Sequence, residues 1–256
     1  MHSQTLIYDG TFDGFLSAVF YTFEYRIYDV FIQNEFSEQE RLFSEKQIVT
    51  TEAVKADRVW KGIQSKVGQS ESYKLYYAFL SEINDIEQSL LDMIRYVFSE
   101  GENAARDYSH PSVLKISKAA KSVGREKHRM EAFVRFKLMK DGIYFSNIEP
   151  DFNVLPLISK HFKNRYADQK WLIYDIKRRY GLFYNLKTVE TIILDLPAEF
   201  DFTKTSESIF TESELEFQKL WQDYFSSVNI TSRKNMKLHV QHVPKRYWKY
   251  MSEKLV

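Results

Sequence analysis

Residues 110–180 read HPSVLKISKAAKSVGREKHRMEAFVRFKLMKDGIYFSNIEPDFNVLPLISKHFKNRYADQKWLIYDIKRRY. Pro111 suits the first turn of a helix, because its missing N–H has no partner to lose there. At about 100° per residue, the apolar and cationic side chains that follow separate onto opposite sides. The apolar side comprises Val113, Ile116, Ala120 and Val123, and the cationic side, here the basic stripe, comprises Lys115, Lys118, Lys121, Arg125 and Arg129. This segment predicts a helix that packs through one face and exposes cations on the other.

The hydrophobic period changes to alternation near Ala132, which indicates a strand. Asp141-Gly142 then forms a strong hairpin-turn signal ahead of an apolar run. Helical spacing returns in residues 154–166, and further strand patterns lie at residues 171–176, 181–186 and 188–194. The pattern predicts an antiparallel sheet of about five strands flanked by helices.

The N-terminal half begins with a strand pattern and continues with helical patterns. An apolar run ends at the turn signal Asp9-Gly10, and either Thr11 or Asp13 could cap the next helix. The expected strand covers residues 4–8, and the expected helices cover residues 12–25, 51–67 and 72–99. The predicted fold class is therefore α+β, with a helix-rich N-terminal half and the antiparallel sheet after it.

The composition is that of a compact globular protein. Of the 256 residues, 16% are aromatic, whereas Gly and Pro number only 8 and 5, the reverse of a disordered chain. The absence of cysteine excludes disulfides, thiol nucleophiles and Cys-ligated zinc or iron–sulfur sites. The N-terminus shows no signal-peptide pattern, and no apolar run approaches the roughly 20 residues that span a bilayer. We expect a cytoplasmic protein with no membrane contact and no cofactor.

A net charge of +1 hides an uneven distribution of charge along the chain. Residues 1–105 contain nine Lys or Arg and seventeen Asp or Glu, whereas residues 115–140 contain nine Lys or Arg and two acids. No Pro-, Gly- or Ser-rich linker separates the two parts. We therefore expect one folded unit, residues 1–256. The alternative is a division into an acidic helical part, residues 1–109, and a basic α+β part, residues 110–256.

Clustered cations favour a polyanion as partner, because neutralising phosphates releases condensed counterions. The C-terminal segment RKNMKLHVQHVPKRYWKY adds cations and aromatic rings that can stack on unpaired bases. The residues expected to contact nucleic acid are the basic stripe together with Arg135, Lys137, Arg233, Lys237, Arg246, Tyr247 and Trp248. The alternatives are a solvated charged face and C-terminal aromatics that belong to the core.

The candidates for catalysis or metal binding are Glu126, His128, Asp151, His161 and Asp175. His and carboxylate ligands would suit a metal that serves phosphodiester chemistry. Their spacing matches no named metal motif, however, and Glu126 and His128 would lie about 200° apart on a helix. Asp175 and Arg178, three residues apart, more often form a structural ion pair. We expect no metal site, and whether the chain is an enzyme stays open.

The chain lacks the motifs of several common enzyme classes. It contains no Gly-x-Ser-x-Gly nucleophile elbow, no Gly-x-x-x-x-Gly-Lys phosphate loop and no dinucleotide-binding fingerprint. Nucleotide hydrolases and dehydrogenases are therefore disfavoured.

Several segments and their order carry a resemblance over essentially the full length. They include YDGTFDGFLSAVF (residues 8–20), KADRVWKGI (55–63), REKHRMEAFVRF (125–136), the stretch that begins PDFNVLPLISKHF, and the C-terminal FQKLWQDYF and SRKNMKLHVQHVPKRYW. The chain resembles a bacterial family described as DNA metabolism proteins of unknown function. Members are usually encoded beside a radical-SAM DNA modification or repair protein, and some are fused to a uracil-DNA glycosylase domain. The resemblance implies a DNA-linked setting and a radical-SAM partner, and it brings no catalytic residues with it.

The basic stripe and the resemblance to this family together favour a nucleic-acid-binding accessory protein of DNA metabolism or repair that acts with a radical-SAM enzyme. One alternative is a metal-dependent or acid/base enzyme acting on nucleic acid through the five candidate residues. Another is a protein-interaction adaptor that docks through its acidic helical half.

Overall fold

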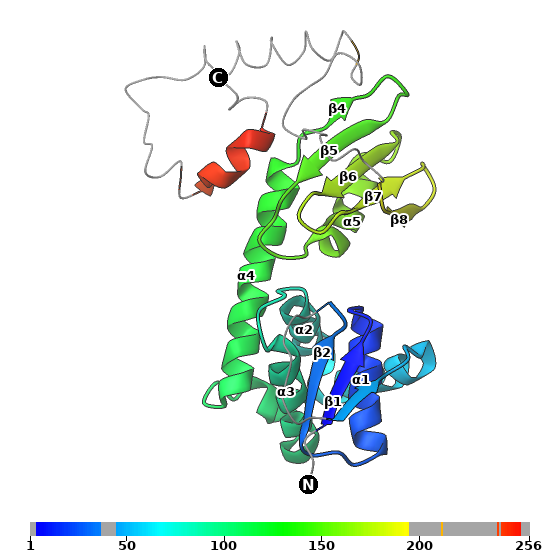
Figure 1. Cartoon of the computed structure of the whole chain (residues 1–256). Helices are drawn as coiled ribbons and strands as arrows, with labels where there is room; N and C mark the ends of the chain where they lie inside the picture. Colours follow the sequence, from blue (N-terminus) through cyan, green and yellow to red (C-terminus); the bar gives the residue numbers. More distant parts are fainter. Residues whose placement is uncertain (1–3, 37–44, 195–210, 212–239, 241, 252–256) are drawn as a thin grey trace. The chain divides into compact units, whose positions relative to one another are not determined.

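The computed structural model describes residues 4–36, 45–194, 211, 240 and 242–251. The chain divides into two compact units, residues 1–124 and 125–256. The boundary between the units falls within helix α4 (Pro111–Phe133; Figure 1).

The first unit contains a three-stranded parallel sheet in the order β2-β1-β3. Strand β1 (Gln4–Tyr8) lies in the centre, and helix α1 (Phe12–Glu24) connects it to β2 (Val30–Asn34). The prediction of β1 and α1 is confirmed. Strands β2 and β3 (Glu45–Ile48) were not predicted from the sequence, and the sequence of β3, EKQI, is polar and exposed, so it gives no hydrophobic signal.

Thr11 caps the N-terminus of α1. Its hydroxyl oxygen accepts a hydrogen bond from the Gly14 amide at 3.0 Å, which satisfies one of the unpaired amides of the first turn. Asp9, at the end of β1, accepts hydrogen bonds from the Thr11 amide at 3.0 Å and the Thr51 hydroxyl at 2.7 Å. Burial alone would raise the pKa of Asp9, but the hydrogen bonds from Thr11 and Thr51 outweigh it and lower that pKa. The sequence had left Thr11 and Asp13 as equal candidates for the cap.

Most of the rest of the first unit consists of helices α2 (Ala53–Phe79) and α3 (Ile86–Glu100). A short 3-10 helix, η1 (Glu102–Arg106), follows α3. The prediction of one helix over residues 72–99 is wrong, because the chain leaves the helix between α2 and α3. Glu82 and Asp85 there have positive φ values of 51° and 59°, which a helix cannot contain. Apolar residues keep their helical spacing across this turn, so periodicity alone does not reveal the break.

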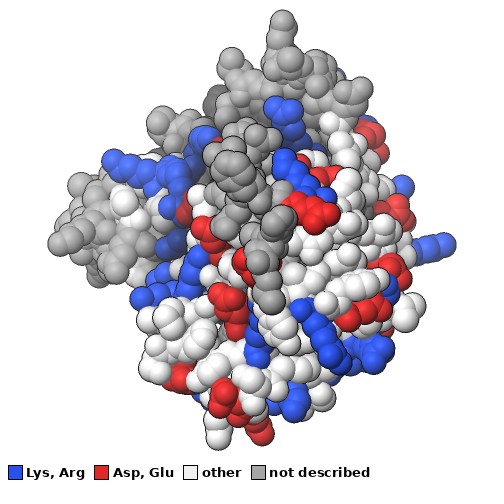
Figure 2. All heavy atoms as spheres, turned by 60° about the horizontal axis from the view of Figure 1, so that its bottom comes forward, with Lys and Arg blue, Asp and Glu red and all other residues white. Residues whose placement is uncertain are grey.

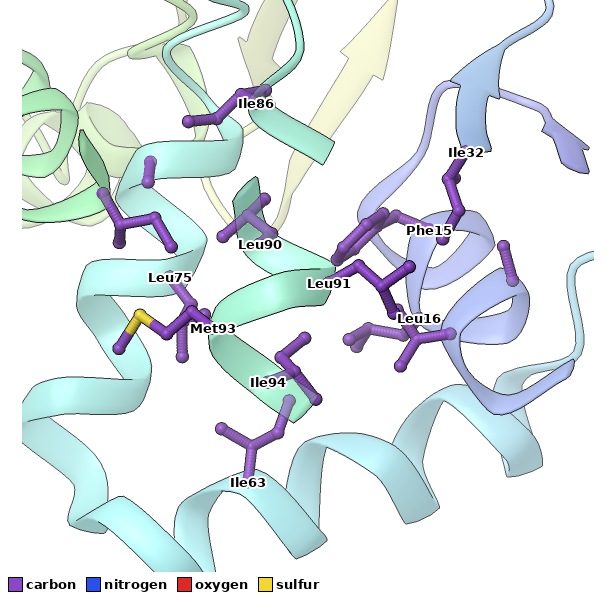
Figure 3. Close-up of a cluster of buried hydrophobic side chains, with 14 of the residues drawn as sticks. Phe15, Leu16, Ile32, Ile63, Leu75, Ile86, Leu90, Leu91, Met93 and Ile94 are labelled. Atoms are coloured by element: carbon purple, nitrogen blue, oxygen red, sulfur yellow. The ribbon is translucent and has the colours of Figure 1, made fainter. Parts of the chain in front are cut away.

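The core of the first unit lies between the sheet and its helices. Figure 3 shows side chains of α1, α2 and α3 that point toward one another, among them Phe15, Ile63, Leu90 and Ile94. All four are almost completely shielded from solvent. The N-terminal part of α4 joins this core through Val113 and Ile116, and the other predicted apolar positions of α4, Ala120 and Val123, are buried too. The apolar side predicted for the helix from Pro111 is therefore confirmed.

The second unit contains a five-stranded sheet in the order β4-β5-β6-β7-β8. The strands are β4 (Lys137–Leu138), β5 (Tyr144–Ile148), β6 (Trp171–Asp175), β7 (Tyr180–Tyr184) and β8 (Val189–Ile192). With this sheet and the helical N-terminal half, the α+β fold class is confirmed. Three of the four strand pairings are antiparallel, but β5 and β6 are parallel because helix α5 (Leu155–Arg165) connects them. The sheet is therefore mixed.

The strand predicted from Ala132 is largely wrong. Helix α4 continues to Phe133, and the strand β4 holds only two residues. Val134 and Phe136 still alternate with polar neighbours, but only Lys137 and Leu138 pair with β5, opposite Phe145 and Tyr144. Alternation over a few residues after a helix therefore does not establish strand pairing.

The two faces of the five-stranded sheet carry different apolar groups. One face gathers Phe145, Leu172 and Tyr174 with partly buried neighbours. Toward α5, Trp171 contacts Phe162 and Tyr184, with ring centroids 6.3 and 5.4 Å away. A second 3-10 helix, η3 (Lys245–Tyr250), packs near β5 and the C-terminal turns of α4. None of the described helices combines the length and apolar character needed to cross a bilayer.

Candidate nucleic-acid interface

The basic stripe lies on the side of α4 that does not pack. Lys118, Lys121 and Arg125 are exposed. Within the described part of the chain, neither Lys118 nor Lys121 forms an ion pair. Figure 2 shows Lys, Arg, Asp and Glu interspersed on the coloured part of the face that it presents. The stretch of α4 between Lys115 and Arg125 contains no acidic residue.

The two outer members of the stripe are held by the protein itself. The Lys115 ammonium donates to the carbonyls of Asn84 and Asp85 at 3.0 and 3.2 Å. The Arg129 guanidinium donates to the carboxylate of Glu126 at 3.4 Å. Both side chains are half-buried, so Lys118, Lys121 and Arg125 are the most accessible cations of the stripe.

The structure places the two cations of the predicted strand differently. Lys137 is only 8% exposed, and its place in β4 turns it away from solvent, so we correct its assignment as a phosphate contact. Arg135 is half-buried, and its guanidinium donates to the carbonyls of Ala132 and Val134 at 2.8 and 3.2 Å. These contacts close the C-terminal end of α4, where backbone carbonyls lack helical partners.

Of the C-terminal candidates, Arg233 and Lys237 lie outside the described residues. Tyr247 is 2% exposed, so its ring cannot stack on a base, and we correct that assignment. Its ring packs against Phe133 with centroids 5.6 Å apart. The indole N–H of half-buried Trp248 donates to the carbonyl of Val243 at 3.0 Å. The side chains of Tyr247 and Trp248 thus serve mainly to hold η3 in place.

Glu126 is the centre of a polar cluster in the second unit. Its carboxylate is 1% exposed and accepts hydrogen bonds from the Tyr247 hydroxyl and, at 2.9 Å, from the Asp151 amide. The guanidinium groups of Arg129 and Arg246 each lie 3.4 Å from the same carboxylate. Burial and the hydrogen bond to Glu126 raise the pKa of Tyr247, so the phenol stays protonated and donates.

Asp151 joins this cluster through its side chain and its backbone. Its carboxylate lies 2.6 Å from the Arg246 guanidinium, which also covers the Tyr247 ring at 4.5 Å. Its carbonyl accepts hydrogen bonds from Arg178 at 3.2 Å and from Lys177 at 3.3 Å. Glu126 and Asp151, 25 residues apart in the chain, are therefore brought together by η3 and by the turn after β6.

Asp175 forms a structural ion pair, as the sequence favoured. Its fully buried carboxylate lies 2.9 Å from the guanidinium of Arg178, which also donates to the carbonyls of Pro150 and Asp151. Burial raises the pKa of Asp175 despite the opposing charge and hydrogen bonds of Arg178. The pair fixes the turn between β6 and β7 against the loop before α5.

The two histidines do not join the cluster. His128 is exposed, and the His161 Nδ1 lies 3.9 Å from the carboxylate of Glu131. Among the residues that the structure describes, no three His, Asp or Glu side chains are grouped so as to hold a metal ion. Of the five catalytic candidates, Glu126 and Asp151 therefore share the cluster, Asp175 is linked to the Asp151 backbone through Arg178, and the two histidines lie outside it.

Sequence reasoning missed Glu149. Its carboxylate accepts from the Lys249 ammonium and the Tyr250 hydroxyl, both at 2.5 Å. The hydrogen bond from Lys249, and to a smaller extent that from Tyr250, lowers the pKa of Glu149. Burial and the hydrogen bond to Glu149 raise the pKa of Tyr250 to about 12. Glu149 and Tyr250 also line a small pocket with Met130, Phe133, Ile148 and Tyr247. Partners a hundred residues apart leave no local signal in the sequence.

Comparison with known proteins gives a family and no activity. A search of curated proteins finds no match to this chain. A family model described as a domain of unknown function, DUF4130, matches residues 84–253, about two thirds of the chain. The matched residues include α3, α4, the five-stranded sheet and the Glu126 cluster. The chain therefore belongs to the DUF4130 family of uncharacterised domains.

Proposed function

We propose that the protein binds nucleic acid through the basic stripe of α4 and acts as an accessory protein in DNA metabolism or repair. The observation that carries the proposal is the exposure of Lys118, Lys121 and Arg125 on one side of a helix whose other side is buried. Lys118 and Lys121 form no ion pair within the described part of the chain, and the sequence has no acidic residue between Lys115 and Arg125.

The spacing of these cations suits a nucleic-acid backbone. Lys118 and Arg125 are seven residues apart, which is about 10 Å along a helix at about 1.5 Å per residue. That length corresponds to about three nucleotide steps at about 3.4 Å along one DNA strand. Three exposed cations over this distance can each neutralise a different phosphate, and counterion release then provides the driving force.

The resemblance makes DNA the preferred polyanion and a radical-SAM protein the expected enzyme partner. In this proposal the chain presents DNA, and the partner supplies the chemistry, because a chain without cysteine cannot ligate an iron–sulfur cluster through thiolates. Co-purification of the two proteins after nuclease treatment would support direct contact. If the two proteins no longer co-purify after nuclease treatment, DNA bridges them and they do not contact each other directly.

Fluorescence polarisation with a labelled single-stranded oligonucleotide tests the binding proposal. Reversing two charges, in Lys118→Glu/Lys121→Glu, should weaken binding at low salt by on the order of tenfold or more. The slope of log K against log salt should become shallower by about 1.4, because about 0.7 counterions per phosphate contact are released for single strands.

The matched control reverses Lys66 and Lys187, two exposed lysines outside α4 that form no ion pair in the described part of the chain. It changes the net charge equally and should leave the affinity close to that of the unaltered protein. Equal weakening by both double variants would show a non-specific charge effect. Absence of binding at low salt would remove the proposal.

The enzyme alternative has weaker support. Four donors already occupy the carboxylate of Glu126, and Arg246 neutralises that of Asp151. A general base needs an accessible oxygen within reach of its substrate. The adaptor alternative has no specific observation in its favour.

A further inference from the structure

The first unit contains an aromatic pocket between α1, α2 and α3. Its apolar lining comprises Phe20, Phe23, Val59, Gly62, Ile94 and Phe98, with Arg58 and Glu24 at the rim. The cavity measures about 640 Å³. Small-molecule sites in proteins typically enclose about 300–1,000 Å³ and are lined mainly by apolar and aromatic side chains. No sequence motif pointed to this pocket.

Two of its rings remain open to solvent. Phe23 and Phe98 are 45% and 38% exposed, and their centroids lie 5.7 Å apart with an angle of 47° between the planes. Gly62 in α2 lies against the Phe98 ring, since a Cβ at this position would stand 3.4 Å from Cζ of Phe98. The pocket therefore offers aromatic surfaces on which a planar ring can stack.

The rim carries one cation whose donors are not taken by an acid. The Arg58 guanidinium lies over the Phe20 ring at 5.6 Å and forms no ion pair among the described residues. The neighbouring Lys55 is neutralised, because its ammonium lies 2.8 Å from Glu52 and 3.7 Å from Glu24. Arg58 can therefore form charge-assisted hydrogen bonds with an incoming anion.

We propose that this aromatic pocket binds one nucleobase together with the phosphate attached to it. The base stacks on one of the two exposed rings, Phe23 or Phe98, and the phosphate receives hydrogen bonds from Arg58. A planar ring with one nearby anionic group matches both the exposed aromatic faces and the single available cation. Stacking of a base on an aromatic side chain typically contributes about 1–3 kcal/mol, so one such site binds weakly by itself.

The nucleotide can come from two sources, a free mononucleotide or one residue of a single strand. Only the second source rests on the proposed nucleic-acid binding by α4. Isothermal titration calorimetry of the full-length protein with deoxyadenosine monophosphate, deoxyadenosine and a hexamer of deoxyadenylate separates the two. Binding of the monophosphate identifies a nucleotide site. Binding of the hexamer alone identifies a strand-borne base in the pocket if the pocket variants Arg58→Glu and Gly62→Leu weaken it, because the basic stripe of α4 also binds a single strand in the proposed function.

Two variants address the two parts of the ligand. Arg58→Glu should weaken binding of the monophosphate, or of the hexamer, by about tenfold, the value of one charge-assisted interaction. Its matched control is Lys61→Glu, an equal charge reversal on the same helix, where Lys61 pairs with Asp57 outside the pocket. Gly62→Leu should also reduce binding by about tenfold or more, because it fills the space beside Phe98. Ser65→Leu places the same side chain on α2 outside the pocket lining and should not.

Leucine favours a helix more than glycine, so Gly62→Leu should stay folded, which circular dichroism checks. The proposal is overturned if neither the monophosphate nor the hexamer binds. It is also overturned if both pocket variants bind as the unaltered protein does, or if deoxyadenosine binds as tightly as its monophosphate. Loss of hexamer binding in Lys118→Glu/Lys121→Glu with unchanged monophosphate binding would separate the pocket from the α4 surface.

Discussion

At the scale of single residues, Glu126 collects four donors on one buried carboxylate. Tyr247 and Asp151 donate from the C-terminal segment and the loop before α5, and Arg129 and Arg246 add two guanidinium groups. A buried carboxylate is tolerated only when opposite charge and hydrogen bonds replace its hydration. Glu126 therefore fastens η3 and the loop at Asp151 to α4.

Glu126→Ala should lower the free energy of unfolding by about 3–5 kcal/mol, because it leaves Tyr247 and the Asp151 amide buried without an acceptor. Glu126→Gln, which keeps an acceptor oxygen, should cost less. Urea denaturation at pH 7 measures both. The control on the same helix is Glu131→Ala, which removes a more exposed pair with Lys127 and should cost about 1 kcal/mol or less. Equal costs for Glu126→Ala and Glu131→Ala would contradict the assigned role.

Glu149 makes a pH-dependent contribution to the attachment of η3. Its pKa is lowered, chiefly by the hydrogen bond from Lys249, so the folded state favours the carboxylate. The resulting stability is present above the unfolded pKa of about 4.3 and is lost as the pH falls through the lower folded pKa. Glu149→Gln should therefore melt below the unaltered protein at pH 7, and the difference in Tm should shrink toward zero below about pH 4.

Thermal melts between pH 3 and 7 measure this difference in Tm. Glu102→Gln, which removes an exposed carboxylate with no ion pair in the described part of the chain, should show little difference at any pH. A difference for Glu149→Gln that stays constant across the range would show that the charge of Glu149 is not its cause.

At the scale of elements, two glycines in helices have opposite roles. Gly68 interrupts α2 with φ 76° and ψ 170°, a region that is essentially restricted to glycine. Gly124 lies within the regular helix α4, and a Cβ there would meet only Cε1 of Tyr77 at 3.9 Å, an ordinary contact. The bend of α2 therefore depends on Gly68, whereas α4 does not require Gly124.

Gly68→Ala should destabilise the protein by about 1–3 kcal/mol through backbone strain alone, since no atom lies within 4 Å of the added Cβ. Gly124→Ala should be neutral or stabilise by up to about 1 kcal/mol, because alanine favours a helix. Chemical denaturation of the two variants measures this contrast. Equal stabilisation by both would mean that α2 straightens at no cost.

At the scale of the whole molecule, the chain holds two units with separate cores, and the boundary between them falls within α4. The first unit packs helices on a parallel sheet, and the second packs α5 on a mixed sheet. Separate cores can open separately, because hydrogen-exchange protection follows cooperative units of structure.

Glu126→Ala should accelerate amide exchange in β5, β6 and β7 by roughly 100-fold, the equivalent of about 3 kcal/mol. The amides of β1 and β2 should keep their protection. Hydrogen–deuterium exchange with mass spectrometry resolves the two sets of peptides. Equal acceleration in β1 would indicate that the two units unfold as one.

Much of this organisation could be predicted from the sequence, because it depends on local periodicity. The helix from Pro111 and the first helix of the chain repeat apolar residues at the helical period, and the strands β6, β7 and β8 lie within short runs rich in apolar and aromatic residues. The arrangement of charged side chains could be predicted in the same way, so the basic stripe and the ion pair of Asp175 with Arg178 followed from the spacing of these residues in the sequence. Such features involve residues a few positions apart, whose relative placement a helix or tight turn fixes.

Tertiary structure alone decided the rest. The polar strand β3, the parallel pairing of β5 with β6, and the burial of Lys137 and Tyr247 arise from contacts with distant segments. The Glu126 cluster joins residues up to 121 positions apart, and the aromatic pocket draws on three helices. Sequence thus determined which faces are apolar or cationic. Only packing could determine which side chains meet, because a long-range contact depends on the fold of all the chain between its partners.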